Sequence, residues 1–365
     1  MKRITVKTTV KKEYDVVITN GFKELAPELT RLGLNGRKCM IVSDDKVAPI
    51  YMEALKEVLC ACDMSCSEYV FEAGEKSKTK ETVDDILDHM VEGSFKRSDI
   101  CIALGGGVVG DMAGFAASQY NRGVPFIQVP TSLLAMSDSS IGGKTGVDYK
   151  GVKNVLGTFY FPDLVYMNTS TLSTLDERQF YNGFAEAMKH GIIKDEHFYE
   201  WLIESMYEIC DRDPDTLEEM LYRSVNIKRI VVEKDPWEAG DRALLNFGHT
   251  LGHAIESCKI DKLLHGECVA LGMVAAAYIS YKKEMISMEE YLEVRDMLVP
   301  FNLPITVEDI DIDTIIANVN KDKKQDNAGL KFILLKKIGK AVIDRSVTEE
   351  EMRAALKEIE YTDEL

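Results

Sequence analysis

The sequence predicts an α/β fold, in which a parallel-sheet domain is followed by a mainly α-helical domain. From Lys2 to about Ser170, short runs rich in β-branched residues alternate with helix-like stretches, which is typical of a parallel sheet flanked by helices. From about Leu175 to Leu298 the pattern changes to long helical segments with few β-branched runs. We therefore expect two domains, residues 1–170 and 171–365.

Seven short β-rich runs are the strand candidates of the first domain. In chain order they are Ile4–Thr8, Tyr14–Thr19, Cys39–Ser43, Ser67–Glu72, Ile100–Leu104, Phe126–Pro130 and Leu164–Met167. Helical patterns lie between them, for example at Val47–Cys60 and Lys80–Glu92. Near the C-terminus, Lys331–Leu335 and Lys340–Asp344 predict a hairpin, and a last helix is expected from Thr348. Because no low-complexity linker separates the domains, we expect tight packing with a ligand cleft between them.

The composition excludes several classes of protein. The 365 residues include 61 Asp and Glu against 44 Lys and Arg, a formal net charge of −17, and 45% of them are hydrophobic. This is enough apolar material for a core, which excludes a disordered chain. The acidic balance opposes generic binding to nucleic acid or to an anionic membrane surface. The longest apolar stretch, Cys268–Ser280, is too short for a membrane span and predicts a buried helix.

Targeting signals and cysteines favour the cytoplasm. No signal peptide is visible in Met1–Asp15, where charged and β-branched residues alternate. The eight cysteines are scattered rather than arranged in a dense framework, which indicates a reducing compartment. Cys60, Cys62 and Cys66 lack a Cys-x-x-Cys pair and a nearby histidine, so we interpret them as thiols at a helix end.

A glycine-rich loop follows the fifth strand candidate. Its residues, Gly105-Gly106-Gly107-Val108-Val109-Gly110-Asp111, fit the spacing Gly-x-Gly-x-x-Gly and lead into a helix-like stretch. Glycines let the backbone approach a pyrophosphate, and the following helix N-terminus supplies N–H donors. Asp44 and Asp45 follow the third strand candidate, and the polar loop Gly74–Lys78 follows the fourth. Three polar loops at successive strand ends indicate a nucleotide-binding crevice.

A serine-rich polar loop follows the sixth strand candidate. It contains Ser137-Asp138-Ser139-Ser140 and Gly142-Gly143-Lys144-Thr145. The first glycine of a phosphate loop is missing because position 138 is Asp, which excludes an ATPase. Cationic side chains beside the motifs imply an anionic substrate, a phosphate or a carboxylate. They are Arg122, Lys144, Lys153, Lys189, Lys228 and Arg242.

Three of the six histidines, His249, His253 and His265, fall within 17 residues. His249 and His253 are four residues apart, so on a helix they share a face, as in two-histidine metal sites. The glutamate of His-Glu-x-x-His is absent, which argues against a zinc protease. A catalytic divalent metal needs three protein ligands and an open position, and the candidates for the third ligand are His265 and Glu186. The spacing leaves the choice among these residues open.

Together these motifs resemble 3-dehydroquinate synthase, a family of sugar-phosphate cyclases in the shikimate pathway of aromatic amino acid biosynthesis. The matching motifs run in order along nearly the whole chain: Gly105–Asp111, Asp138–Thr145, Lys153-Asn154, Glu186–Lys189, Arg242–His253 and His265–Glu267. The resemblance implies a Rossmann-like NAD-binding domain followed by a helical metal- and substrate-binding domain. It implies a lyase that turns 3-deoxy-D-arabino-heptulosonate 7-phosphate into 3-dehydroquinate and phosphate. The implied cofactors are NAD and one divalent metal, zinc or cobalt.

The resemblance also implies roles for individual residues. It selects Glu186, His249 and His265 as metal ligands and makes His253 catalytic, in place of the pairing of His249 with His253. Arg122 matches an arginine that reaches the neighbouring subunit's phosphate site, which implies a homodimer. The other catalytic and substrate positions are Lys144, Lys189, Asn154, Lys228, Glu238, Arg242, Asn246, Asp138 and one of Lys323 and Lys324. The implied NAD contacts are Asp44, Glu75, Lys78, Gly106, Gly107, Val108, Asp111, Thr131, Ser132, Lys144, Lys153, Thr171, Leu172, Ser173 and Thr174.

Three other kinds of protein share parts of this pattern. A metal-dependent polyol dehydrogenase also uses NAD and a metal, but a neutral polyol needs no cationic site such as that of Arg242 and the Asp138–Lys144 loop. Another sugar-phosphate cyclase, such as 2-deoxy-scyllo-inosose synthase, is a closer alternative, although Asn246 favours dehydroquinate synthase. A catalytically silent NAD-binding regulator would be expected to have lost metal ligands, whereas all three implied positions are filled.

Overall fold

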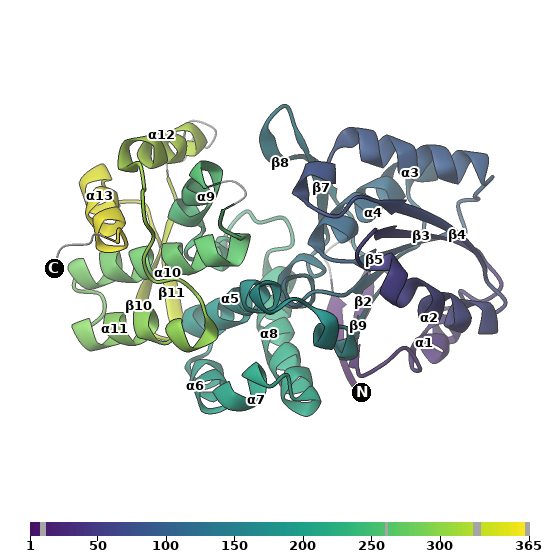
Figure 1. Cartoon of the computed structure of the whole chain (residues 1–365), viewed down its shortest axis with the longest axis horizontal. Coiled ribbons are helices and arrows are strands. Elements are labelled where there is room, and N and C mark those ends of the chain that lie inside the picture. The colour runs from purple at the N-terminus through teal and green to yellow at the C-terminus, as the bar shows by residue number, and fades with distance from the viewer. Residues whose placement is uncertain (8–11, 260–261, 324–329, 362–365) are drawn as a thin grey trace. The chain divides into compact units, whose positions relative to one another are not determined.

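The chain divides into two units, and the computed structural model describes residues 1–7, 12–259, 262–323 and 330–361. Unit 1 comprises Met1–Leu175 and Leu217–Trp237, and unit 2 comprises Asp176–Thr216 and Glu238–Leu365. Unit 1 contains the large sheet and unit 2 is mainly helical (Figure 1), which confirms the predicted α/β class. The predicted boundary at residue 170 places Leu217–Trp237 in the second domain, whereas these residues belong to unit 1.

A seven-stranded sheet forms the centre of unit 1. In spatial order its strands are β1 (Lys2–Lys7), β2 (Glu13–Thr19), β9 (Leu164–Asn168), β6 (Phe126–Pro130), β5 (Ile100–Gly105), β3 (Lys38–Asp44) and β4 (Ser65–Phe71). Neighbouring strands run parallel from β2 to β4, whereas the edge strand β1 pairs with β2 in antiparallel fashion. The carboxyl ends of the parallel strands therefore lie along one edge of the sheet.

Helices cover both faces of this sheet (Figure 1). They are α1 (Leu25–Arg31) and α2 (Ala48–Ala61) on one face, and α3 (Lys80–Glu92) and α4 (Gly107–Gln119) on the other. Alternate residues of β3 enter the two resulting cores, with Cys39 and Ile41 in the first and Met40 and Val42 in the second. Burial of a strand on both faces is typical of a parallel sheet between helical layers. The near-continuous apolar run of β3 follows from this arrangement.

Short segments and a hairpin complete unit 1. They are η1 (Glu75–Ser77), η2 (Tyr120–Arg122), the π-helical turn η3 (Ala135–Ser139), β7 (Lys144–Tyr149), β8 (Val152–Phe159), η4 (Thr169–Thr174) and most of α8 (Pro214–Lys234). Where a polar loop is predicted after the sixth strand candidate, β7 and β8 form an antiparallel pair, so these strands are a correction. A Cβ at Gly157 would lie 2.2 Å from the carbonyl oxygen of Thr145. The glycine that lets the strands meet also weakens the β pattern in the sequence.

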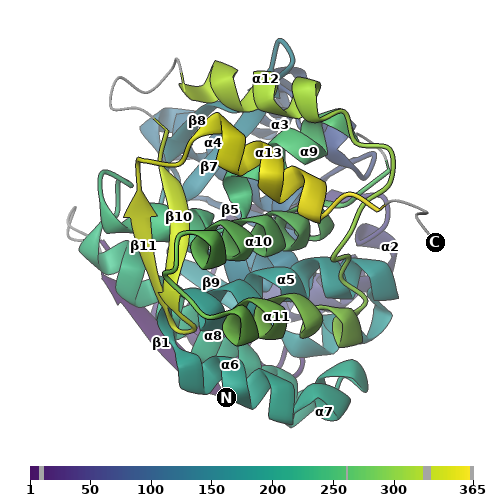
Figure 2. The same ribbon diagram turned by 90° about the vertical axis from the view of Figure 1, so that its left-hand side faces the viewer.

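Helix α10 is the central element of unit 2 (Figure 2). The unit contains α5 (Glu177–Lys194), α6 (Glu196–Glu204), α7 (Met206–Cys210), η5 (Asp241–Asn246), α9 (His249–Cys258), α10 (His265–Lys282), α11 (Met288–Asp296), η6 (Val299–Phe301), α12 (Ile312–Lys323), β10 (Phe332–Lys337), β11 (Lys340–Asp344) and α13 (Glu349–Glu358). Helix α10 packs against α5, α9, α11 and α13, which confirms the buried helix predicted from the apolar stretch. Neither α10 nor any other helix in the described ranges has the length and apolar character needed to cross a membrane.

The C-terminal elements agree with their sequence signals. Strands β10 and β11 form the predicted antiparallel hairpin. Helix α13 begins after Thr348, whose hydroxyl accepts a hydrogen bond from the N–H of Glu351 at 3.2 Å. The N–H of Thr348 in turn donates to the Glu351 carboxylate at 2.7 Å. This reciprocal cap explains why the helix starts at the predicted residue.

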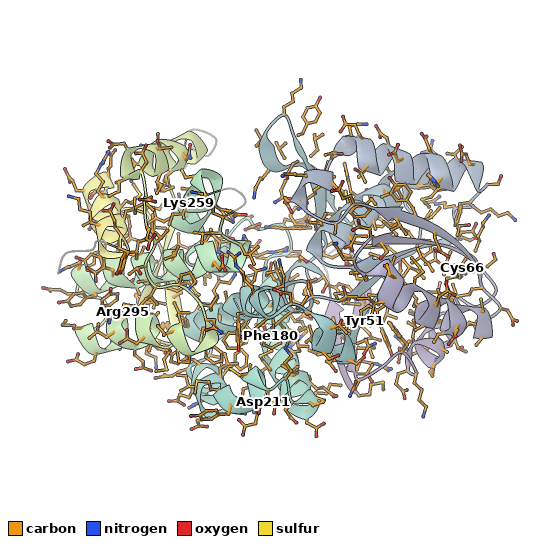
Figure 3. The ribbon with its side chains drawn as sticks, in the orientation of Figure 1. Tyr51, Cys66, Phe180, Asp211, Lys259 and Arg295 are labelled. Carbon is orange, nitrogen blue, oxygen red and sulfur yellow. The ribbon has the colours of Figure 1, made fainter. Side chains whose placement is uncertain are left out.

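All eight cysteines have free thiols. Cys60 belongs to α2 and Cys62 caps its C-terminus, as expected of helix-end thiols. Cys66 instead lies on the edge strand β4 (Figure 3), where its sulfur is 3.2 Å from that of Cys39 on β3. The helix-end interpretation is therefore wrong for Cys66, because β4 begins at Ser65, before the predicted strand start.

Candidate active site

The carboxylate of Glu186, on α5, lies at the centre of a buried cluster in unit 2. Nε2 of His249 is 3.6 Å from Oε1 of Glu186, and Nε2 of His265 is 3.7 Å from the same oxygen. The other oxygen, Oε2, accepts a hydrogen bond from Nζ of Lys189, one turn later on α5. Glu186 and Lys189 are both buried. Oε1 itself accepts no hydrogen bond from the described part of the chain.

The two separations between Oε1 of Glu186 and the imidazole nitrogens fit a divalent metal ion. A tetrahedral zinc ion with bonds of about 2.0–2.1 Å holds its ligand atoms about 3.3 Å apart. The separations of 3.6 and 3.7 Å are close to this value. A carboxylate with two imidazoles is a donor set suited to zinc or cobalt. A bound ion would also give the buried oxygen of Glu186 the partner that buried polar atoms normally have.

The second ring nitrogen of each histidine is held by the protein. Nδ1 of His249 lies 3.1 Å from the carbonyl oxygen of Phe247, and Nδ1 of His265 lies 3.3 Å from Oε2 of Glu256. Metal-binding histidines typically donate their second N–H to such a carbonyl or carboxylate, which directs Nε2 toward the metal. Glu256 is not among the predicted site residues, although its position seven residues after His249 on α9 places both on one helix face.

The charges around Glu186 shift the pKa values of the cluster. Burial opposes ionisation of Glu186, but Lys189, His265 and His249 outweigh it and bring its pKa well below the ordinary value. Burial, together with the charge of Lys189, lowers the pKa of His249 well below its ordinary value. Burial also opposes the charge of His265, but Glu186 and Glu256 raise its pKa to about 9. An ionised carboxylate and a neutral imidazole are the forms that bind a metal, so Glu186 and His249 already have these forms near neutral pH, whereas His265 has to release a proton when a metal binds.

Glycines bring the helices that carry the two histidines together. Gly248 precedes α9 with a φ of 80°, and a Cβ there would lie 2.7 Å from the carbonyl oxygen of Val269 on α10. A Cβ at Gly272 of α10 would lie 1.8 Å from the carbonyl oxygen of Gly248. Helices α9 and α10 therefore meet backbone to backbone. This contact leaves the ring centroids of His249 and His265 5.5 Å apart.

His253 lies one turn after His249 on α9 and has an exposed side chain. Its ring centroid is 4.9 Å from that of His249 and 5.6 Å from that of His265. One nitrogen from each of the three rings lies within 4.8 Å of the others, so a three-histidine site is geometrically open. The contacts with Oε1 of Glu186, however, come from His249 and His265. Oε1 of Glu186 therefore faces the two histidines that are predicted to be metal ligands together with it.

Other predicted substrate residues form local pairs within each unit. In unit 2, Nδ2 of Asn246 donates to Oε1 of Glu238 at 3.0 Å, and Arg242 is buried in η5. In unit 1, the buried Nζ of Lys228 donates to the carbonyl oxygen of Asp138 at 2.7 Å and to its carboxylate. The second pair ties α8 to the turn η3. It helps to explain why Leu217–Trp237 belongs to unit 1.

The residues predicted to bind NAD all lie in unit 1. Those after the carboxyl ends of β3, β4, β5, β6 and β9 are Asp44, Glu75, Lys78, Gly106, Gly107, Val108, Asp111, Thr131, Ser132, Thr171, Leu172, Ser173 and Thr174. Lys144 and Lys153 are exposed on β7 and β8. In open α/β sheets this carboxyl edge is where ligands bind. The five polar segments that the sequence spreads over the domain therefore share one edge of the sheet.

Lys78 connects three segments of this edge. Its Nζ lies 2.7 Å from Oδ2 of Asp111 on α4 and donates to Oδ1 of Asn154 on β8 at 2.6 Å. Burial opposes the charge of Lys78, but Asp111 and Glu75 outweigh it and raise its pKa. For Asp111, burial is the larger effect and raises its pKa, although Lys78 opposes the change. Lys78 thereby holds the β7–β8 hairpin against the glycine-rich loop.

Two predicted positions are separate from these groups. Arg122 lies on the exposed turn η2 with a left-handed φ of 65°. Lys323 is the last residue of α12, and Lys324 lies outside the described residues. The structure therefore adds no contact that separates the two lysines.

Sequence comparison covers both units. The chain matches the 3-dehydroquinate synthase N-terminal family over residues 68–182 and the 3-dehydroquinate synthase C-terminal family over residues 183–325. It is 40% identical to the 3-dehydroquinate synthase of Acetivibrio thermocellus over 341 residues, which cover 93% of this chain and 94% of that protein. It is 42% identical to the 3-dehydroquinate synthase of Acinetobacter baumannii, over 88% of this chain and 90% of that protein.

Solved structures of sugar-phosphate cyclases share the fold. The 2-epi-5-epi-valiolone synthase of Streptomyces hygroscopicus, solved with NAD⁺ and Zn²⁺, has a TM-score of 0.88 and 30% identity and covers 95% of this chain and 96% of its own. A 2-deoxy-scyllo-inosose synthase, solved with carbaglucose-6-phosphate, NAD⁺ and Co²⁺, also has a TM-score of 0.88, with 25% identity and coverages of 98% and 99%. Because the two family models together match residues 68–325 and the chain is 40–42% identical to dehydroquinate synthases over about nine tenths of its length, the chain belongs to the 3-dehydroquinate synthase family.

Proposed function

We propose that this chain converts 3-deoxy-D-arabino-heptulosonate 7-phosphate to 3-dehydroquinate and phosphate, with NAD and one divalent metal ion, zinc or cobalt. The observation that carries the proposal is the buried Oε1 of Glu186 faced by Nε2 of both His249 and His265. Membership of the synthase family supplies the reaction. The valiolone and inosose synthases, which contain NAD⁺ with Zn²⁺ or Co²⁺, support the choice of cofactors.

Glu186, His249 and His265 would hold the metal and leave a coordination position for substrate hydroxyls. A metal held there would supply polarisation of these hydroxyls, and NAD would supply reversible hydride acceptance, which is the chemistry needed for oxidation, phosphate elimination, reduction, ring opening and aldol closure. Lys189 donates to Oε2 of Glu186, which favours the ionised carboxylate and leaves Oε1 toward the imidazoles. His253, exposed beside the ligand pair, is suited to hold or move a proton at the substrate.

The remaining polar residues would bind and orient an anionic sugar acid. Lys144, Lys228 and Arg242 supply positive charge for a phosphate and a carboxylate, and Arg offers a two-pronged fork. Amide and carboxylate groups of Asn154, Asn246, Glu238 and Asp138 would bind the hydroxyls. A substrate that carries a dianionic phosphate explains why an acidic chain retains so many cations beside its motifs.

NAD would bind at the carboxyl edge of the unit 1 sheet. The pyrophosphate would lie over Gly106 and Gly107, at the N-terminus of α4, where N–H donors and the helix dipole favour an anion. A Cβ at Gly107 would lie 3.0 Å from Oγ of Ser139, so a side chain would also crowd this loop. Asp44, the last residue of β3, would accept a hydrogen bond from a ribose hydroxyl.

The assembly and the compartment are also part of the proposal. We propose a homodimer in which Arg122, exposed on η2, reaches the phosphate of the neighbouring active site. The eight free thiols support a reducing compartment, for which the cytoplasm is the simplest choice. Partners other than the sugar acid and a second copy of the chain are not required by any of these features.

A phosphate-release assay tests the reaction. The purified protein, given the heptulosonate phosphate, Zn²⁺ or Co²⁺ and a catalytic amount of NAD, should release one phosphate per substrate without net NADH. Chelation should abolish turnover, and restored metal should recover it. Sustained accumulation of NADH would contradict the proposal and favour a dehydrogenase. Glucose 6-phosphate is the matched control, because its carba-analogue is bound in the inosose synthase structure; release of phosphate from it alone would indicate a different cyclase.

A further inference from the structure

Three residues of α5 form a ladder of contacts with the N-terminal turn of α10. Arg178, Asn182 and Glu186 are spaced by four, so they share one face of α5. Glu186 faces His265 at 3.7 Å, as described above. Along the same face the other two residues contact the two residues that follow His265 in the chain. Helices α5 and α10 run side by side (Figure 2), which makes this succession possible.

The Asn182 contact fixes the backbone next to His265. Oδ1 of Asn182 accepts a hydrogen bond from the N–H of Gly266 at 2.5 Å, and both residues are buried. A Cβ at Gly266 would lie 1.9 Å from the carbonyl oxygen of Asn182. Only a residue without a side chain therefore permits this approach. The backbone of α10 is held against α5 one residue after the predicted ligand.

Arg178 makes a two-pronged contact with residues on both sides of His265, the predicted metal ligand. Nε and Nη2 of Arg178 donate to the two carboxylate oxygens of Glu267 at 2.6 and 2.7 Å, and Nη2 also donates to the carbonyl oxygen of Lys262 at 2.7 Å. The same Glu267 accepts a hydrogen bond from the N–H of Leu264 at 2.8 Å. Arg178 thus binds residues on both sides of His265. Such a planar, two-pronged contact restricts orientation as well as distance.

We propose that Arg178 and Asn182 are positioning residues for the metal centre, which hold the His265 turn so that its Nε2 meets Oε1 of Glu186. The inference rests on the proposed function, because it takes Glu186 and His265 as metal ligands. Neither positioning residue touches the ligand atoms. They act by holding two helices in register at the site where both carry a ligand, and outer groups of this kind commonly change metal affinity by about 10–100-fold.

Arg178 is the better residue to change. Its side chain is 53% exposed and borders a cavity of about 290 Å³, so a substitution there leaves no buried unpaired group on α5. Arg353 on α13 is the matched control, because it also makes an Arg–carboxylate contact in unit 2, 2.7 Å from Asp313, and lies 36% exposed. Both can be replaced by methionine, which keeps the length of the side chain.

Zinc affinity is the readout that separates positioning from simple stability. Dissociation constants are measured by competition with a chromogenic chelator on the full-length wild-type chain, Arg178→Met, Arg178→Lys, Glu267→Gln and Arg353→Met, with thermal midpoints of the metal-free proteins. We expect Arg178→Met to bind zinc about 10–100-fold more weakly, with Arg178→Lys and Glu267→Gln between it and wild type. Arg353→Met should bind as wild type does. The metal-free midpoint of Arg178→Met should fall below that of Arg353→Met, because the buried Glu267 carboxylate loses its partner whereas Asp313 is exposed. Zinc affinities are therefore compared at a temperature at which all the metal-free chains are folded, so that a loss of affinity reports the geometry of the site.

Two outcomes would overturn the inference in distinguishable ways. If Glu186→Ala abolishes stoichiometric zinc binding while Arg178→Met and Glu267→Gln bind zinc as tightly as wild type, the ladder has no positioning role and the proposed metal site stands. If Glu186→Ala binds zinc as wild type does, the metal site itself is misassigned and the inference fails with it. The absorption bands of Co²⁺ in place of zinc add a geometric test, since a displaced His265 would change them in Arg178→Met. Should Arg178→Met not fold, Glu267→Gln carries the comparison, because its side-chain oxygen still caps Leu264.

Discussion

At the residue scale, the central feature is that the two carboxylate oxygens of Glu186 contact different partners. Oε2 accepts from Lys189, whereas Oε1 faces two imidazoles. A buried lysine next to a buried carboxylate costs desolvation that the pair recovers only in a well-formed contact. The pairing keeps the carboxylate ionised in the protein interior. Burial alone would raise the pKa of Glu186, but Lys189 and the two histidines together lower it. The consequence is that the carboxylate proposed to bind the metal is ionised near neutral pH.

The two histidines of α9 should respond differently to removal. His249→Ala removes a ligand atom, so metal content should fall from about one ion per chain to near zero. His253→Ala should retain the metal but lose activity by about 1,000-fold or more, because it removes a proton-handling group rather than a ligand. Metal analysis of the purified variants, with phosphate release measured in parallel, checks both. Loss of metal from His253→Ala would restore the ligand pair that helix spacing suggests.

At the scale of secondary-structure elements, the site depends on how closely helices approach. Gly248 and Gly272 let α9 and α10 meet through their backbones, and Gly266 does the same for α10 and α5. Ligands from three helices can converge only if the helix axes are nearer than ordinary side chains allow. Gly248 of the Arg242–His253 motif and Gly266 of the His265–Glu267 motif are therefore structural partners of the histidines they accompany.

Gly272→Ala should uncouple α9 from α10. The added Cβ would lie 1.8 Å from the carbonyl oxygen of Gly248, which cannot move without shifting α9. We expect a loss of about 3 kcal/mol in the free energy of unfolding, measured with urea on the metal-free protein, together with weaker zinc binding. Gly93→Ala on unit 1 is the control, because its Cβ would meet chiefly the ring of Phe95, a side chain able to shift. Equal stability of Gly272→Ala and wild type would show that the helices are not in backbone contact.

At the scale of the whole molecule, the chain distributes its proposed functions between two units. Unit 1 carries the predicted NAD contacts and the Lys228–Asp138 pair, and unit 2 carries the predicted metal ligands. The net charge of −17 describes the protein as a whole and opposes generic nucleic-acid binding. It says nothing against an anionic substrate, because the cations beside the motifs act locally. Whole-molecule charge and site charge are separate quantities.

The proposed exchange of Arg122 between subunits can be tested by complementation. Arg122→Ala and His253→Ala should each be nearly inactive, but mixed dimers should contain one complete site that combines His253 of one subunit with Arg122 of its partner. Random reassociation of equal amounts should recover about a quarter of wild-type activity, since half of the dimers are mixed and each has one complete site of two. The control pairs His253→Ala with His249→Ala, which leaves every site defective. No recovery above the separate variants would contradict the exchange.

Local patterns were enough for the fold class and for most elements. The seven strands of the large sheet, α3 and the cap of α13 follow from short-range alternation, periodicity and the Thr348–Glu351 capping box. The β7–β8 hairpin was missed because its Gly146 and Gly157 are poor strand formers that only the opposing backbone requires. Cys66 was misplaced because a strand boundary two residues away changes its environment from helix end to sheet edge.

By itself, the sequence determined an α/β chain with a glycine-rich loop after a buried strand, three neighbouring histidines and the motif order of its family. Spacing could not choose among Glu186, His253 and His265 as partners of His249, because helical periodicity relates only residues on one helix. The tertiary structure brings α5, α9 and α10 together and aims two imidazoles at one carboxylate oxygen. It alone places Arg178 and Asn182 beside the His265 turn, since those contacts join residues far apart in the chain. Long-range packing, which leaves no local trace, decided the geometry of the site.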